Sequence, residues 1–203
     1  MNAASEAPAR CPWAGPEPIY IAYHDEEWGV PNADERALFE KLLLEGFQAG
    51  LSWITVLKKR QRFREVFDNF DAEKMARYDG AKIAALLADP GIIRHRGKIE
   101  AAISNARAYL ELRKKTTLAR HLWQFVDGVP QQHAYRRLEE IPAQTEISRK
   151  MAKSLKSLGF RFCGPTTVYA FMQSMGMVND HLVSCPGHAR CTSLATSFQL
   201  PAE

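Results

Sequence analysis

The sequence lacks any apolar run long enough to cross a membrane. Such a run needs about 20 residues, and the apolar stretches of this 203-residue chain are all far shorter. Residues 1–10 also lack the apolar core and the basic start of a signal peptide. We therefore expect a cytoplasmic protein with no membrane partner, in which residues 1–10 form a disordered lead.

Cysteine is scarce, which excludes a disulfide-stabilised scaffold. The four cysteines are Cys11, Cys163, Cys185 and Cys191. In a reduced compartment, a cysteine near a histidine indicates a metal site rather than a disulfide. Internal repeats, low-complexity tracts and strand-like alternation are missing as well. These absences predict an all-α fold.

The excess of positive charge is small. The chain carries 27 Lys and Arg residues against 23 Asp and Glu residues, for a formal charge of +4. A charge of this size permits an acidic partner such as nucleic acid but does not require one. The 46% hydrophobic content is ordinary for a globular protein. We expect a single two-lobed domain over residues 11–190 and a disordered tail over residues 191–203.

Capping residues divide the chain into helices. Residues 11–31 are rich in aromatic residues and proline and are expected to be irregular. The first helix is therefore predicted to begin at Asn32, which has the spacing of a capping box to Glu35. A single helix is predicted over residues 57–67, and its many Lys and Arg residues are most simply a solvated face. Asp71 is predicted to cap a further short helix.

An acidic residue interrupts the apolar face of the first predicted helix. Leu38, Leu42 and Glu45 are spaced so that their side chains share one face. A carboxylate there is costly unless it is hydrogen-bonded or has a function. Gly46 and Gly50 then interrupt the helix. An isolated Glu of this kind is more simply a hydrogen-bonded residue at a helix end, and a ligand-binding carboxylate is the alternative.

Two predicted helices form a hairpin over residues 145–176. Thr145 is predicted to cap the first of them. Gly164 lies beside the start of the second, where free backbone N–H groups can hold a phosphate. Lys156 and Arg161 could add positive charge. The pattern therefore indicates a DNA-backbone contact, with an ordinary pair of packed helices as the alternative.

Cysteine and histidine recur together at the two ends of the predicted domain. His181 and Cys185 are four residues apart and are predicted to face one zinc ion from a single helical turn. Two ligands do not complete a structural site. Two further pairs could complete it: Cys11 with His24, or His188 with Cys191. A third possibility is that no metal binds.

Four segments carry a more specific pattern. They are residues 20–31 (YIAYHDEEWGVP), 45–53 (EGFQAGLSW), 91–99 (GIIRHRGKI) and 178–181 (VNDH). In this order they resemble the DNA-3-methyladenine glycosylase I family of bacterial alkylation-repair enzymes, and the similarity covers nearly the whole chain. The resemblance implies a helix-hairpin-helix DNA glycosylase fold with a second helical lobe, whose chain ends are tied together by zinc.

The resemblance also implies the zinc ligands. Carried over by motif, they are Cys11, His24, His181 and Cys185. They would bind one structural Zn²⁺, which decides between the pairs left open above.

The same resemblance assigns the base site. It implies that Glu45 and Tyr23 read the edge of a bound base as the catalytic pair and that Trp53 stacks on it. Tyr20 and Trp28 would help to wall the pocket.

Three further positions, one of them a departure from the family pattern, follow from the comparison. Leu51, on a turn after Gly50, matches the residue that enters the gap left in the DNA. Phe47 stands where a polar Gln is expected, so its role stays open. Asp180 precedes a proposed ligand, and a helix cap or a hydrogen bond to His181 explains it as well as catalysis does.

The implied function is the release of 3-methyladenine from double-stranded alkylated DNA, leaving an abasic site. No protein partner is implied, and a monomer is expected. A non-enzymatic DNA-binding module would explain the hairpin and the metal but not Glu45 beside Trp53. A zinc hydrolase would need an open coordination position, which four protein ligands would fill.

Overall fold

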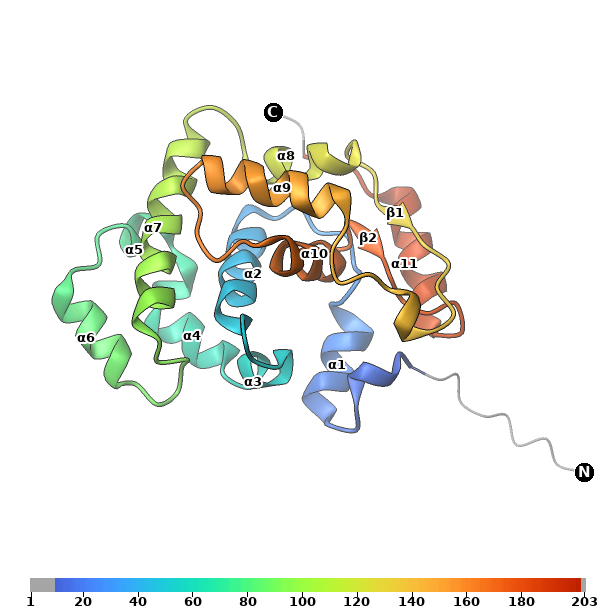
Figure 1. Cartoon of the computed structure of the whole chain (residues 1–203), viewed down its shortest axis with the longest axis horizontal. Helices are drawn as coiled ribbons and strands as arrows, with labels where there is room; N and C mark the ends of the chain where they lie inside the picture. Colours follow the sequence, from blue (N-terminus) through green and yellow to red (C-terminus); the bar gives the residue numbers. More distant parts are fainter. Residues whose placement is uncertain (1–9, 202–203) are drawn as a thin grey trace, which may run out of the picture.

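The computed structural model describes residues 10–201, and most of them are helical (Figure 1). The helices are α1 (Pro18–Glu26), α2 (Glu35–Gln48), α3 (Trp53–Leu57), α4 (Arg60–Val66), α5 (Ala72–Met75), α6 (Gly80–Ala88), α7 (Arg96–Arg113), α8 (Leu118–Trp123), α9 (Glu146–Ser157), α10 (Pro165–Ser174) and α11 (Pro186–Ser197). Short 3₁₀ helices lie at Pro12–Ala14, Asp68–Phe70, Gln124–Val126 and Leu138–Glu140. The all-α prediction is confirmed, except that β1 (Gln131–Gln132) and β2 (Val178–Asn179) form one short parallel pair.

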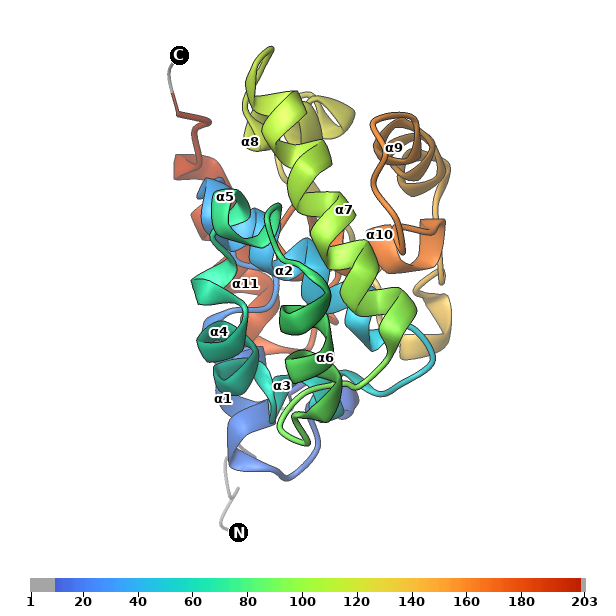
Figure 2. The same ribbon diagram turned by 90° about the vertical axis from the view of Figure 1, so that its left-hand side faces the viewer.

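Helix α2 lies at the centre of the fold. It packs against α3, α7, α8 and α10. Figure 2 shows α7 crossing beside α2, with α4 and α5 on one side and α9 and α10 on the other. The buried apolar residues of α2 cover most of its circumference: Leu38, Phe39, Leu42, Leu43, Leu44 and Phe47. Because residues 41–47 of this helix are all buried, the charged residues Lys41 and Glu45 lie in the core.

The aromatic segment before α2 is not irregular as predicted. Pro18 occupies the first turn of α1, where its missing N–H leaves no hydrogen bond unmade, and the helix continues to Glu26. The predicted start of α2 is wrong as well. Asp34 caps the helix by accepting a hydrogen bond from the Ala37 N–H at 2.8 Å. Asn32 instead accepts from the Asp34 N–H, so it orders the turn before the cap.

The helix predicted over residues 57–67 is divided into α3 and α4. The break lies at Lys58 and Lys59, where the Lys59 N–H bonds to the Val56 carbonyl three residues back. The basic residues of α4 are not a free stripe. Arg60 pairs with Glu27, Arg62 with Asp89 and Arg64 with Glu40.

Residues 191–201 are not part of a disordered tail, and residues 202–203 of the predicted tail lie outside the described part of the chain. Helix α11 continues to Ser197, and Cys191 on it is buried. Phe198 then stacks on Trp123 with ring centroids 4.2 Å apart. The sequence analysis missed the contacts of Cys191 and Phe198 because the segment is otherwise composed of small and polar residues. Of the predicted lead, Arg10 is described, and residues 1–9 lie outside the described part of the chain.

The hairpin of α9 and α10 forms where the sequence predicts it. Thr145 caps α9, since its Oγ1 accepts from the Ser148 N–H at 3.1 Å. Residues 158–164 join the two helices, which pack on each other and place α10 against α2. Gly46 permits this approach, because a Cβ at that position would lie 3.3 Å from the Cβ of Phe162. The hairpin loop therefore contacts the end of α2 directly.

Within residues 10–201, no helix combines the length and the apolar character needed to span a membrane.

Candidate active site and metal centre

An aromatic cavity of about 260 Å³ lies between α1, α2, α3 and α10. Tyr23 and Trp53 are buried in its wall, with ring centroids 5.4 Å apart. The lining residues are Trp13, Tyr20, Tyr23, Trp28, Glu45, Gln48, Trp53, Leu138, Ile141, Ala170 and Gln173. All five residues that the sequence assigns to the base site therefore meet at one cavity.

Glu45 is buried, with 4% of its surface exposed. Its Oε1 accepts an ion-paired hydrogen bond from Lys41 Nζ at 2.9 Å, one turn earlier on α2. Lys41 Nζ also donates to the Tyr23 hydroxyl at 2.8 Å and lies 3.2 Å from the centroid of the Trp53 ring. Burial lowers the pKa of Lys41 to about 8, against the opposing effect of Glu45. Burial, together with the Glu45 charge, raises the pKa of Tyr23.

Two buried polar atoms at this cavity have no hydrogen-bond partner. Among residues 10–201, they are the only such side-chain atoms: Glu45 Oε2 and Trp53 Nε1. Buried polar groups are satisfied in the great majority of cases, and an unsatisfied one calls for a ligand, a water or an ion. One atom accepts and the other donates. The cavity therefore offers two unused hydrogen-bonding groups next to flat aromatic surfaces.

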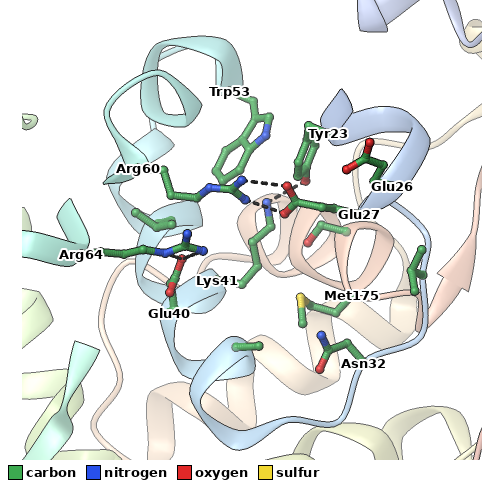
Figure 3. Close-up of a pocket in the computed structure, with 14 residues that line it drawn as sticks. Tyr23, Glu26, Glu27, Asn32, Glu40, Lys41, Trp53, Arg60, Arg64 and Met175 are labelled. Carbon is green, nitrogen blue, oxygen red and sulfur yellow. Dashed lines mark hydrogen bonds and ion pairs between the residues drawn. The ribbon is translucent and has the colours of Figure 1, made fainter. Parts of the chain in front are cut away.

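A second cavity of about 210 Å³ lies beyond Tyr23 and Trp53, which border both spaces, and Lys41 lines this second cavity (Figure 3). Figure 3 shows Lys41 reaching from α2 toward the two rings. Besides Glu26, the remaining charged groups of this second cavity are paired with each other. Arg60 binds Glu27, and Arg64 binds Glu40.

Sequence reasoning missed three residues of this site. Lys41 was missed because a Lys and a Glu four residues apart are usually an exposed ion pair. Trp13 lies in the aromatic segment but was given no role, although its ring is 4.9 Å from that of Trp28. Gln173 reaches the cavity from α10, where no sequence signal marks it.

Phe47 and Asp180, whose roles the sequence leaves open, do not line the aromatic cavity. Phe47 is buried and stacks with Phe63 at 4.7 Å between centroids, so it belongs to the core. Asp180 is fully buried and accepts hydrogen bonds from Tyr169 and Gln173 at 2.7 and 2.8 Å. His133 lies 2.6 Å from its other oxygen. Asp180 thus orients Gln173 rather than reaching the cavity itself.

Leu51 projects from the turn between α2 and α3. It is 42% exposed, and the turn needs Gly50, whose φ is +80°. Lys98 on α7 holds the turn from behind, because its buried Nζ donates to the carbonyls of Phe47 and Ala49 at 2.9 and 2.5 Å. This contact accounts for the segment of residues 91–99. Leu51 is thus an exposed apolar side chain on a turn that the hydrogen bonds from Lys98 hold in place.

The hairpin presents positive side chains to solvent. Lys153, Lys156 and Arg161 are exposed, and they border one groove together with Gly164. No ion pair to these three side chains is recorded among residues 10–201. They are therefore available to an anionic partner.

The two ends of the domain meet in a buried cluster of cysteine and histidine. Its members are Cys11, His24, His181 and Cys185. One donor atom from each lies within 4.8 Å of all the others, so the cluster could hold a metal ion. Each histidine directs one ring nitrogen toward the cluster and makes a hydrogen-bond contact outside the cluster with its other ring nitrogen. His24 Nδ1 lies 2.8 Å from Asp25, and His181 Nε2 lies 3.0 Å from the Trp28 carbonyl. Such outer contacts fix the ring orientation that a metal ligand needs.

The surroundings of the cluster favour a thiolate. Hydrogen bonding from the Cys11 thiol, and then from the rings of His181 and His24, lowers the pKa of Cys185. Gly187 makes room for the His181 ring, because a Cβ at position 187 would lie 2.3 Å from the ring's Cε1.

The local alternative for the metal ligands is wrong. His188 Nε2 binds the His133 carbonyl at 2.7 Å, and Cys191 lies against the Trp28 carbonyl. The predicted helical turn over His181 and Cys185 is absent too. They belong to an irregular turn that ends where Cys185 precedes α11.

Comparison with known proteins gives a consistent result. Residues 13–188 match the family model for methyladenine glycosylases. The DNA-3-methyladenine glycosylase of Haemophilus influenzae is 51% identical over 87% of this chain and 96% of its own length. DNA-3-methyladenine glycosylase 1 of Escherichia coli is also 51% identical, over 87% of this chain and 95% of its own.

Solved structures agree. A crystal structure of 3-methyladenine DNA glycosylase I has a TM-score of 0.87 and 51% identity, covering 89% of this chain and all of its own. The Staphylococcus aureus 3-methyladenine DNA glycosylase I, whose recognition of 3-methyladenine has been described structurally, has a TM-score of 0.86 and 36% identity. That match covers 90% of this chain and 98% of the other.

If the cysteine and histidine cluster binds a metal, removing one ligand should reduce metal binding and stability together. Cys185→Ala should lower the bound metal and the melting temperature together, because the free energy of metal binding adds to that of folding. Elemental analysis and thermal unfolding measure the two quantities. Cys163→Ala is the matched control, since Cys163 is also buried but lies outside the cluster. Full metal retention in Cys185→Ala would contradict the assignment.

Proposed function

We propose that this chain, which belongs to the methyladenine glycosylase family and is an N-glycosyl hydrolase, flips 3-methyladenine out of double-stranded DNA and hydrolyses its glycosidic bond. It leaves an abasic site and acts as a monomer. The observation that carries the proposal is the unpaired Oε2 of Glu45 at an aromatic cavity. A base inside a duplex cannot reach such a buried cavity, so it must be flipped, at a cost of a few kcal/mol.

The chemistry places a modest demand on the enzyme. A methyl group on N3 makes the adenine nucleoside cationic, so the base departs as a neutral leaving group. The sugar is left with oxocarbenium character and is captured by water. The main task is then to select the methylated base from the excess of normal adenine. Stacked aromatic rings suit that task, because a desolvated cation over a ring gains about 0.5–2 kcal/mol.

Glu45 and Tyr23 read the edge of the base in this proposal. Since Lys41 occupies Oε1 of Glu45, Oε2 is the oxygen left to accept a hydrogen bond from the amino group of the base. The Tyr23 oxygen accepts from Lys41, so its own proton can be donated. Trp53 stacks on the base, and Tyr20 and Trp28 close the sides of the cavity.

Leu51 and the hairpin engage the DNA. Leu51 fills the space that the flipped base leaves, which is the use made of apolar wedges in other DNA-binding proteins. Lys156, Arg161 and the backbone at Gly164 hold phosphates without reading sequence. On this basis α9 and α10 are the helix-hairpin-helix element.

The metal is structural Zn²⁺ in this proposal, held by the four residues of the cysteine and histidine cluster. A tetrahedral zinc has bonds of about 2.3 Å to sulfur and about 2.05 Å to nitrogen, which separates these two donors by roughly 3.6 Å. The Sγ atom of Cys185 lies 3.5 Å from the inward nitrogen of each histidine. The donor set therefore fits zinc. Four buried protein ligands leave no position for a catalytic water, which disfavours a zinc hydrolase.

The proposal is tested most simply with Glu45→Gln. Lys41 keeps the amide oxygen on its side, which turns the amide NH₂ toward the amino group of the base. Such a mispaired buried group costs about 1–3 kcal/mol, or roughly 5- to 150-fold in affinity. Calorimetry with free 3-methyladenine and release assays on methylated duplex measure the loss. Glu40→Gln on the same helix is the control, and equal binding of the base by Glu45→Gln and wild type would make the carboxylate structural.

Leu51→Gly should impair activity on duplex DNA much more than on single strands, where no stack has to be refilled. A wedge that contributes about 1.4 kcal/mol corresponds to a tenfold difference. Release rates on matched methylated duplex and single strands give the ratio. Leu51→Met, which keeps an apolar side chain of similar size, should retain it. Equal losses on both substrates would assign Leu51 to folding or to the pocket.

Arg161→Ala and Lys156→Ala should weaken DNA binding to a similar extent on every sequence. Each lost phosphate contact should also reduce the dependence of log K on log salt by about 1. Fluorescence anisotropy at several salt concentrations measures both effects. Lys114→Ala, an exposed lysine at the far end of α7, is the control. Unchanged slopes for both hairpin variants would remove the hairpin from the interface.

A further inference from the structure

The side chain of Lys41 contacts three residues of the proposed base site. Its Nζ atom lies within 3.2 Å of Glu45 Oε1, the Tyr23 hydroxyl and the centroid of the Trp53 ring. Figure 3 shows the side chain entering between the two rings from α2. Lys41 lines the second cavity, which shares Tyr23 and Trp53 with the aromatic cavity.

The position is an expensive one for a lysine. Only 8% of Lys41 is exposed, and a buried ammonium must be paired to be tolerated. Of the neighbouring charges it pairs with Glu45, since Arg60 is held by Glu27 and Arg64 by Glu40. Apolar residues in place of both Lys41 and Glu45 would fill the same space at lower cost. The contacts of Lys41 are therefore explained by the site and not by the core.

We propose that Lys41 is a positioning residue for base recognition. This inference rests on the proposed function of Glu45, Tyr23 and Trp53. By holding Oε1, Lys41 leaves one defined oxygen of Glu45 for the base. By donating to the Tyr23 oxygen, it turns the hydroxyl proton away from itself and toward the base.

Lys41 also restricts stacking on Trp53. The ammonium occupies one face of the ring at 3.2 Å, so a base can stack only on the other face. The ammonium balances the Glu45 charge before the base enters. The empty cavity therefore has its donor, its acceptor and its stacking face fixed in advance, which reduces the free-energy cost of ordering these groups on binding.

A double-mutant cycle tests the proposal. The four proteins are wild type, Lys41→Met, Glu45→Gln and the double variant, and the measurement is the Kd for free 3-methyladenine by calorimetry. Lys41→Met should weaken binding roughly tenfold in the wild-type background. In the Glu45→Gln background it should weaken binding by a smaller factor, less than about threefold, because Glu45 no longer presents an acceptor to the base and only the contacts of Lys41 with Tyr23 and Trp53 still act.

The cycle separates positioning from a structural role. A merely structural lysine would lower affinity by the same factor in both backgrounds, and that result would overturn the proposal, as would an unchanged Kd for Lys41→Met. Arg64→Met is the matched control, because Arg64 lines the second cavity without contacting Glu45. If Lys41→Met does not fold, the same cycle with Lys41→Gln, an uncharged side chain that can still donate to Glu45, should show a coupling of the same sign.

Failure of this inference is distinguishable from failure of the proposed function. If Glu45→Gln binds 3-methyladenine as tightly as wild type, the proposed function fails whatever Lys41 does. If Glu45→Gln loses affinity and Lys41→Met does not, only the role of Lys41 is wrong.

Discussion

A buried carboxylate on the central helix is the constraint around which this protein is organised. Glu45 lies on the buried part of α2, among apolar residues such as Leu38, Leu42 and Leu44. A charge in that position has to be paired, and Lys41 supplies the pair from one turn away. The pair satisfies one oxygen only. The other oxygen and the Trp53 Nε1 remain unpaired, which is an unstable arrangement for a core and a suitable one for a binding site.

The cysteine and histidine cluster supports the same site from the other side. His24 directly follows Tyr23 on α1, and the Trp28 carbonyl lies 3.0 Å from His181 Nε2. Whatever fixes the two histidines therefore fixes Tyr23 and Trp28 as well. A metal there would join the beginning of the domain to the turn before α11. Because Tyr23 and Trp28 neighbour the cluster, a metal bound there would stabilise the same part of the chain that forms the proposed base site.

The parts that the sequence predicts well are those set by local spacing. Glu45 on an apolar face and Thr145 as a cap could be recognised, because helical periodicity and capping are local. Lys41 could not, since its burial depends on rings brought from α1 and α3. The helix starting at Pro18 and the ordered segment around Phe198 were missed because proline-rich or small polar composition is also typical of loops. Their order comes from tertiary contacts.

The most direct test asks which cavity holds the base, since Tyr23 and Trp53 border both the aromatic cavity and the second one. Bound 3-methyladenine can be located by nuclear Overhauser effects from its methyl and ring protons to assigned side chains. The account predicts contacts with the rings of Tyr20 and Trp53, on the Glu45 side. Contacts with Met175 and Ala37 would place the base in the second cavity and contradict the account.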